Sequence, residues 1–193
     1  YLMAEECHPM CFDLELEKAG ISFSKKGIEV NEYLQSTTNA NIYAAGDAAD
    51  SRGLPLTPVA VLEGHVVASN IIKGNKKKVS YPPMPSVVFT LPTMATVGLL
   101  EDEAKEKGYD INVNFEKVDN WFNARRLNVD EYAYKTIIDK NNNTILGAHL
   151  IGPHCEETIN LFAMAIKTKM TISDLRTMIF SYPTMASDLT YIL

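Results

Sequence analysis

Short apolar runs separated by polar turns occupy the first part of the chain, a pattern typical of strands and turns in an α/β unit. Residues 14–19 read as a short helical or turn segment that ends at Gly20, and residues 28–30 open a strand. The run at residues 41–45 leads into Gly46. We expect residues 41–45 to form a buried strand, because a short apolar run bounded by a turn is typical of one.

The next apolar pattern has helical spacing. After a loop at residues 53–55, Thr57 offers a hydroxyl suited to the N-cap, and Pro58 suits the first helical position. Apolar residues then continue at helical spacing until Gly74 ends the pattern. The sequence therefore predicts a helix over residues 57–72.

Three prolines within four positions, Pro82, Pro83 and Pro85, mark a domain boundary, since such a run neither continues a helix nor pairs inside a sheet. We divide the chain into residues 1–80 and residues 81–193. The second part is predicted to contain strands and helices mostly joined by hairpin-length connections. The strands are residues 87–90, 94–99, 111–117, 132–139 and 144–151, and the helices are residues 101–108, 154–170 and 173–179, with Ser173 or Thr171 as cap of the last.

This order of elements predicts an α+β fold, an antiparallel sheet with helices on one face, preceded by a remnant of an α/β domain. The chain has 193 residues, of which 46% are hydrophobic, enough for a sizeable core. Its net charge of -6 argues against nucleic-acid binding, which requires a basic surface. Residues 76–78, the one basic run, read as a solvated linker.

No stretch is apolar over the roughly 18 to 20 residues that cross a bilayer, and no signal peptide precedes the pattern, so we expect a cytoplasmic protein without a membrane partner. Cys7, Cys11 and Cys155 do not read as a disulfide framework, and we expect reduced thiols. His8, His65, His149 and His154 lack the spacing of metal ligands, so no metal site is predicted.

The most informative residues follow the predicted strand at 41–45. Ligands of open α/β sheets bind at the carboxyl ends of strands, where Asp47 can accept hydrogen bonds and Gly46 lets a ligand approach the backbone. An ordinary strand that ends in a turn would look the same. The helix start at Thr57 adds unpaired amides and the positive end of a helix dipole, which stabilise negative charge, although an ordinary capped helix remains the alternative.

Six ordered blocks carry a resemblance to a known family. From Gly20 to Leu193 the chain resembles the C-terminal part of the pyridine nucleotide-disulfide oxidoreductases, the flavoenzymes that include glutathione reductase, dihydrolipoamide dehydrogenase and mercuric reductase. The blocks are residues 26–31, 41–47, 56–60, 85–90 with 97–98, 145–152 and 182–184.

The resemblance implies a role for each block of the first part. The family's Asp at the position of Asp47 binds the ribityl chain of FAD, and Gly46 and Ala45 line that approach. Residues 56–60 match the second flavin-contacting segment. Leu56, Thr57, Pro58, Val59 and Ala60 are therefore expected near the isoalloxazine ring, where the helix end faces the negative charge of reduced flavin.

The chain departs from the family near its end. Members with thiol or disulfide substrates carry a His-Pro-Thr sequence whose His, held by a Glu five residues later, exchanges protons across the dimer interface. Tyr182 and Ser187 take these two positions as the candidate catalytic residues, and Asp188 follows. Tyrosine ordinarily has a pKa of about 10 and histidine one of about 6.5, so tyrosine is a poor general base at neutral pH. Quinone, oxygen, a metal ion or an unusual disulfide fits as acceptor.

The resemblance further implies that the parent enzyme moves hydride from NADH or NADPH to FAD and onward to an acceptor, and that residues 81–193 form a homodimer. These 193 residues lack the Gly-x-Gly-x-x-Gly fingerprints and the family's redox cysteine pair, so this fragment is expected to be inactive and to bind FAD weakly. The start at Tyr1 favours a truncated product. A non-catalytic dimerisation module is the alternative, and a coenzyme A disulfide reductase or NADH oxidase is a third reading.

Overall fold

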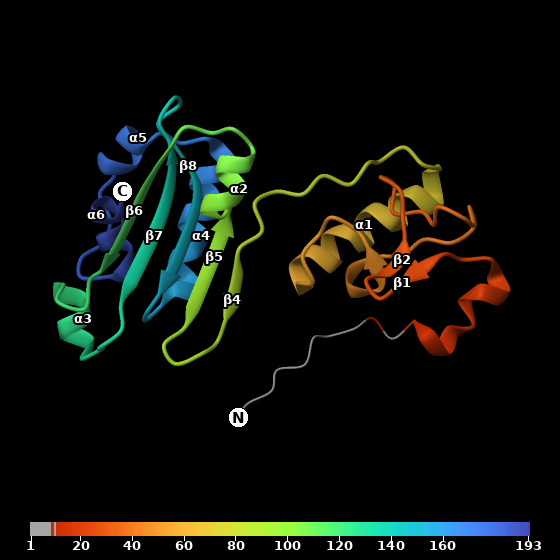
Figure 1. The fold of residues 1–193 in the computed structure, drawn as a ribbon, viewed down its shortest axis with the longest axis horizontal. Coiled ribbons are helices and arrows are strands. Elements are labelled where there is room, and N and C mark those ends of the chain that lie inside the picture. Colours follow the sequence, from red (N-terminus) through yellow and green to blue (C-terminus); the bar gives the residue numbers. More distant parts are fainter. Residues whose placement is uncertain (1–8, 10) are drawn as a thin grey trace. The chain divides into compact units, whose positions relative to one another are not determined.

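The computed structural model describes Pro9 and residues 11–193, so Cys7 and His8 lie outside the described residues. Contacts divide the chain into two compact units, Tyr1–Tyr81 and Pro82–Leu193 (Figure 1). Within the described part, no helix is both long enough and apolar enough to cross a membrane.

The first unit contains a small three-stranded sheet. Strand β2 (Gly27–Glu29) lies in the middle, antiparallel to β1 (Phe23–Ser24) and parallel to β3 (Ala49–Asp50). The 3-10 turns η1 (Phe12–Leu14) and η2 (Leu16–Ala19) precede β1, and η3 (Gly46–Ala48) lies directly before β3. Gly20 ends η2 in the left-handed region at φ 67°. A cluster of small and branched side chains forms the core of this sheet: Cys11, Leu16, Ile21, Ile28, Ala44 and Ala49.

The strand expected at residues 41–45 is an extended segment with one isolated bridge, between Tyr43 and Gln35. Its backbone bonds run to a tight turn, since the Ala44 amide donates to the Leu34 carbonyl at 3.0 Å. The regular pairing with β2 begins only at Ala49. An apolar pattern predicts burial, and Ala44 is indeed buried. The pattern does not predict which segment of backbone forms hydrogen bonds with residues 41–45.

Helix α1 (Thr57–Lys73) confirms the predicted helix to within one residue at its end. Its N-cap is Leu56 rather than Thr57, and no side chain caps it, because the amides of Val59 and Ala60 both donate to the Leu56 carbonyl. The buried face of α1 is made by residues four and three positions apart: Val59, Glu63, Val66 and Asn70.

The second unit is built on a five-stranded antiparallel sheet in the order β4-β5-β8-β7-β6. The predicted fold class is confirmed. The strands, in chain order, are β4 (Ser86–Val88), β5 (Met94–Gly98), β6 (Ile111–Lys117), β7 (Ala133–Asp139) and β8 (Thr144–Ile151).

Three helices lie behind the sheet in Figure 1: α4 (Cys155–Thr168), α5 (Ile172–Arg176) and α6 (Leu189–Ile192). Helix α4 buries Ile159, Phe162 and Ala165 in the core that includes Ala95 and Leu150. Thr171 caps α5, since its hydroxyl accepts from the Asp174 amide and the Asp174 carboxylate accepts in return. Helix α3 (Phe122–Leu127) and the turn η4 (Met185–Asp188) were not predicted.

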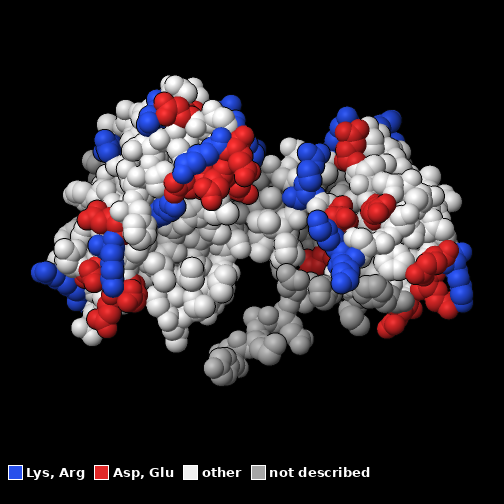
Figure 2. Space-filling model, in the orientation of Figure 1, with Lys and Arg blue, Asp and Glu red and all other residues white. Residues whose placement is uncertain are grey.

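Helix α2 (Glu101–Glu106) lies in front of the sheet in Figure 1. Glu101 pairs with Lys135 of β7 at 2.5 Å and with Lys105 at 2.6 Å. Figure 2 shows the acidic first turn of α2 interspersed with lysines. The lead-in to α2 passes directly over Gly147, which pairs with Gly98 of β5, since a Cβ on Gly147 would lie 3.1 Å from the Leu99 nitrogen and closer still to its oxygen.

Candidate functional site

The turn that carries Asp47 is packed against the first turns of α1. Gly46 has φ 65°, and a Cβ built on it would lie 2.9 Å from the Ala60 Cβ. Glycine is favoured here for two reasons, the left-handed backbone and the close approach of the helix. Since Ala60 lies one turn after Thr57, the fold brings the Gly46–Asp47 turn beside the N-terminal end of α1.

A buried carboxylate holds this turn in place. Glu63 is 1% exposed and accepts three hydrogen bonds, from the Gly46 amide at 2.6 Å, the Ser51 hydroxyl at 2.7 Å and the Tyr81 hydroxyl at 2.5 Å. Sequence reasoning missed Glu63. The signal was its position on the apolar stripe of α1, four residues after Val59 and three before Val66, where a charged residue needs buried partners.

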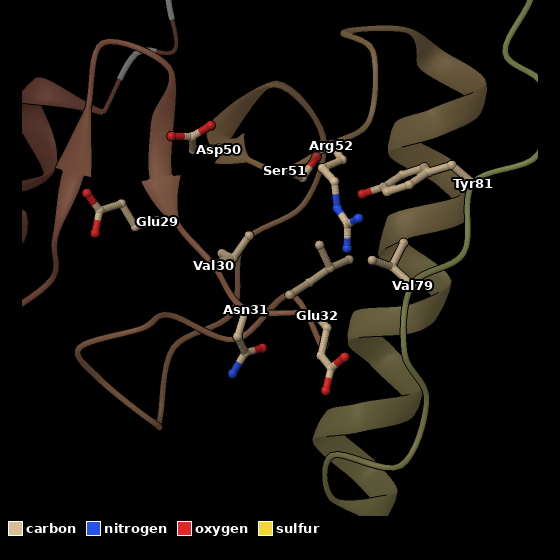
Figure 3. A pocket seen from close by; sticks show the side chains of 10 residues that line it. Glu29, Val30, Asn31, Glu32, Asp50, Ser51, Arg52, Val79 and Tyr81 are labelled. Atoms are coloured by element: carbon tan, nitrogen blue, oxygen red, sulfur yellow. The ribbon is translucent and has the colours of Figure 1, made fainter. Parts of the chain in front are cut away.

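Tyr81 remains a neutral donor to Glu63. Burial, together with the hydrogen bond to Glu63, raises the pKa of Tyr81 to about 12. The two hydroxyl donors, Ser51 and Tyr81, also line a cavity of about 370 Å³ (Figure 3). Charged side chains of both signs border it, including Arg52 and Glu29.

Asp47 itself faces solvent. Its carboxylate is exposed and accepts no hydrogen bond from any described residue, so it caps neither the turn nor a helix. Thr57 and Pro58 are exposed as well, Leu56 and Ala60 are half-buried, and Val59 is buried in the core. Among the described residues the Thr57 amide has no acceptor, so α1 begins with a free donor and the positive end of its dipole.

Tyr182 projects from the second unit. Its side chain is 70% exposed and stacks on Phe122, with ring centroids 5.7 Å apart and planes inclined by 25°. No described residue hydrogen-bonds its hydroxyl. The Tyr182 hydroxyl is thus available to an outside partner, while its ring is stacked on Phe122.

Neither Ser187 nor Asp188 orients Tyr182. The Ser187 hydroxyl donates to the Thr184 carbonyl at 2.5 Å. Asp188 is 8% exposed and turns inward, accepting from Asn123 at 2.9 Å and from the Tyr132 hydroxyl at 3.2 Å. Burial raises the pKa of Asp188, against the opposing effect of these two hydrogen bonds.

In the described part of the chain, no three His, Cys, Asp or Glu side chains gather as they would around a metal ion. Cys11 and Cys155 are free and buried. Burial raises the pKa of Cys155 to about 12, with a further contribution from Glu156. His149 is engaged inside the second unit, with Thr96 at 2.6 Å and the Leu99 carbonyl at 3.3 Å.

Residues 84–191 match the family model described as the dimerisation domain of pyridine nucleotide-disulphide oxidoreductases. Residues 11–64 match a second model, described as pyridine nucleotide-disulphide oxidoreductase. The chain belongs to this family. The matches fall within the two structural units, and the resemblance of the six sequence blocks is confirmed.

Relatives of two lengths are found. The chain is 52% identical over 180 residues to an uncharacterized 19.7 kDa protein in a mercuric resistance operon of Staphylococcus aureus, covering 93% of this chain and 100% of that protein. It is 37% identical over 189 residues to mercuric reductase of S. aureus, covering 97% of this chain, and 35% identical to a glutathione reductase of Pisum sativum, covering 93%. The chain spans only 34% and 32% of these two enzymes.

The fold matches solved structures of a related enzyme. The HOCl-induced flavoprotein disulfide reductase RclA from Escherichia coli superposes with a TM-score of 0.82 at 30% identity, over 96% of this chain and 42% of that one. A Cu(II) complex of the same protein gives a TM-score of 0.83 at 29% identity, over 96% of this chain and 43% of that one.

Proposed function

We propose that this chain supplies the C-terminal part of an FAD-dependent NAD(P)H oxidoreductase of the cytoplasm, divided near residue 80 into an FAD-domain remnant and a dimerisation domain. One observation carries the proposal: the Gly46 turn packs on α1, and it presents an exposed carboxylate without an internal partner beside an uncapped helix end. When bound, FAD accepts hydride from NADH or NADPH and passes electrons to an acceptor.

The residues of the first unit fit such a cofactor. Asp47 would accept hydrogen bonds from the hydroxyls of the ribityl chain. Gly46 has no side chain, so the flavin could approach its backbone closely. The segment Leu56, Thr57, Pro58, Val59 and Ala60 places a helix end, with the free Thr57 amide, where reduced flavin carries negative charge. Their part is to bind and orient.

The second unit, residues 81–193, forms a homodimer in this proposal. Large apolar side chains lie exposed in its last third, among them Met164 (66% exposed), Ile179 (99%) and Tyr182 (70%). Such residues suit a subunit interface, whereas Phe162 and Met185 belong to the core.

The acceptor in this proposal is a metal ion rather than a thiol or disulfide, and mercuric ion is the candidate suggested by the mercuric reductase relatives. The position of Asp188 supports this choice, because a carboxylate turned toward Tyr132 does not orient Tyr182 as a proton-exchanging base. Assays of the parent enzyme with Hg(II) and with a disulfide panel test it, with Tyr182→Phe as the variant. Turnover of disulfides but not of Hg(II) overturns the choice of acceptor, and an unchanged Hg(II) rate in the variant removes Tyr182 from the mechanism.

A second candidate is a non-catalytic dimerisation module without a flavin. The match to a 19.7 kDa protein over that protein's whole length favours it. Titration with FAD to millimolar concentration, followed by amide NMR shifts, separates the two. Shifts confined to Gly46, Asp47, Thr57, Val59 and Ala60, and reduced in Asp47→Ala, support the flavin site. A dimer of 21.5 kDa chains without such shifts supports the module.

A further inference from the structure

We propose that Glu63 is the positioning residue of the Gly46–Asp47 turn, and that its buried carboxylate sets where Asp47 stands relative to the start of α1. The cofactor-binding part of this inference rests on the proposed flavin site. The positional part concerns the chain alone.

The geometry assigns different tasks to the two carboxylate oxygens of Glu63. Oε2 accepts from the Gly46 amide at 2.6 Å, and Oε1 accepts from Ser51 at 2.7 Å and from Tyr81 at 2.5 Å. The Gly46 amide can only donate. The two hydroxyls can reverse direction and accept instead. The Gly46 amide is therefore the one donor of the three that always needs an acceptor at position 63.

Packing leaves the turn little freedom once this bond is made. Ala60 lies against one side of Gly46, and Gly53 closes the other end of the network, since a Cβ on Gly53 would lie 2.7 Å from Glu63 Oε1. Asp47 is the next residue after Gly46, and no described residue makes a hydrogen bond to its side chain. The position of Asp47 therefore depends on that of Gly46, which the hydrogen bond to Glu63 fixes.

Tyr81 extends the network to the end of the first unit, because it is the last residue before Pro82 opens the second. The Tyr81 hydroxyl shares Oε1 with Ser51, so its removal leaves the Gly46 bond intact. Tyr81→Phe is therefore a matched control, because it removes a hydrogen bond to the same carboxylate but at Oε1 rather than at Oε2.

Glu63→Gln is the conservative variant. Its amide oxygen takes the place of Oε2 and accepts from Gly46, and its NH2 group faces two hydroxyls that can accept. Glu63→Met keeps a similar volume but offers the Gly46 amide no acceptor, so this variant leaves the N–H without its partner.

Hydrogen exchange of the Gly46 amide, measured without flavin, tests the positional claim. We expect protection in the wild type, Glu63→Gln and Tyr81→Phe, and exchange at least tenfold faster in Glu63→Met, with the amide of Asn70 unchanged. Fast Gly46 exchange in the wild type overturns the proposal whether or not a variant folds. Equal exchange in Glu63→Met, or loss of protection along the whole of α1, overturns it as well.

An FAD titration of the same four proteins tests the cofactor part. Weaker binding in Glu63→Met, restored in Glu63→Gln, supports Glu63 as a positioning residue of the flavin site. Equal FAD affinity in Glu63→Met and the wild type overturns that role. Absence of binding in the wild type contradicts the proposed flavin site but leaves the exchange result, and the positional claim, standing.

Discussion

The Tyr132 hydroxyl donates a hydrogen bond of 3.2 Å to the Asp188 carboxylate inside the second unit. Tyr132 is 3% exposed and Asp188 is 8% exposed. Burial raises the pKa of both groups. A carboxyl whose pKa is higher in the folded than in the unfolded state binds its proton more tightly when folded. Its contribution to stability is complete below the ordinary pKa of 3.8 and is lost as the pH rises through the folded pKa.

Asp188→Asn is expected to remove this pH dependence, because the amide does not titrate and still accepts one of the two hydrogen bonds. Relative to the wild type, its unfolding free energy should increase as the pH rises above 3.8. Asp188→Ala leaves the buried Tyr132 hydroxyl without its acceptor and should lower the unfolding free energy by about 1–3 kcal/mol. Urea unfolding across this pH range checks both variants. A constant difference between wild type and Asp188→Asn contradicts the expectation.

Gly46→Ala should destabilise the chain by more than Gly20→Ala. Both glycines have left-handed backbones, at φ 65° and φ 67°, and this strain costs a side chain about 1–2 kcal/mol. Only the Cβ of Gly46 meets a neighbour, Ala60 at 2.9 Å, whereas nothing lies within 4 Å of the Gly20 Cβ. Thermal unfolding measures the difference. The double variant with Ala60→Gly should recover part of it, and equal losses for the two single variants would show that the contact is harmless.

The fold class followed from the sequence because long strands and the proline run carry local signals. Helix α1 was also predictable, but its N-cap residue was not. The N-cap is Leu56 rather than Thr57 because the amides of Val59 and Ala60 donate to the Leu56 carbonyl, and the residue types do not indicate which carbonyl accepts these bonds. The Glu63 and Asp188 networks were out of reach. Their partners lie 17 and 18 residues away for Gly46 and Tyr81, and 56 away for Tyr132. Short-range patterns do not report such contacts.

Glu101 should make the second unit sensitive to acid. Its hydrogen bonds to Lys105 and then Lys135 lower the pKa of Glu101 to about 2. A lowered pKa contributes stability above the ordinary value of 4.5, and that contribution is lost as the pH falls toward 2. Unfolding midpoints measured from pH 4.5 downward should fall more steeply in the wild type than in Glu101→Gln. High salt should shrink the difference, since the pairs are partly exposed. Glu106→Gln serves as control on the same helix.

Cys155 should be inert in the folded chain. It is 2% exposed, and burial raises its pKa to about 12, so almost no thiolate exists at pH 8. A disulfide reagent at that pH is expected to leave Cys155 unmodified until denaturant is added, as judged by mass spectrometry of its peptide. Modification in the native protein at the rate of a free thiol would contradict the burial described here.

The opposed pair Gly98 and Gly147 makes two positions of the sheet behave as one. A methyl group on Gly147 would meet the Leu99 backbone that leads into α2, and one on Gly98 would meet the Leu146 carbonyl oxygen and the Cα of Gly147 itself. We therefore expect that, among the positions of β5 and β8, neither Gly98 nor Gly147 accepts a residue with a side chain. A second-site change that restores a Gly147 variant would have to move the Leu99 backbone, whereas one that restores a Gly98 variant would have to move strand β8.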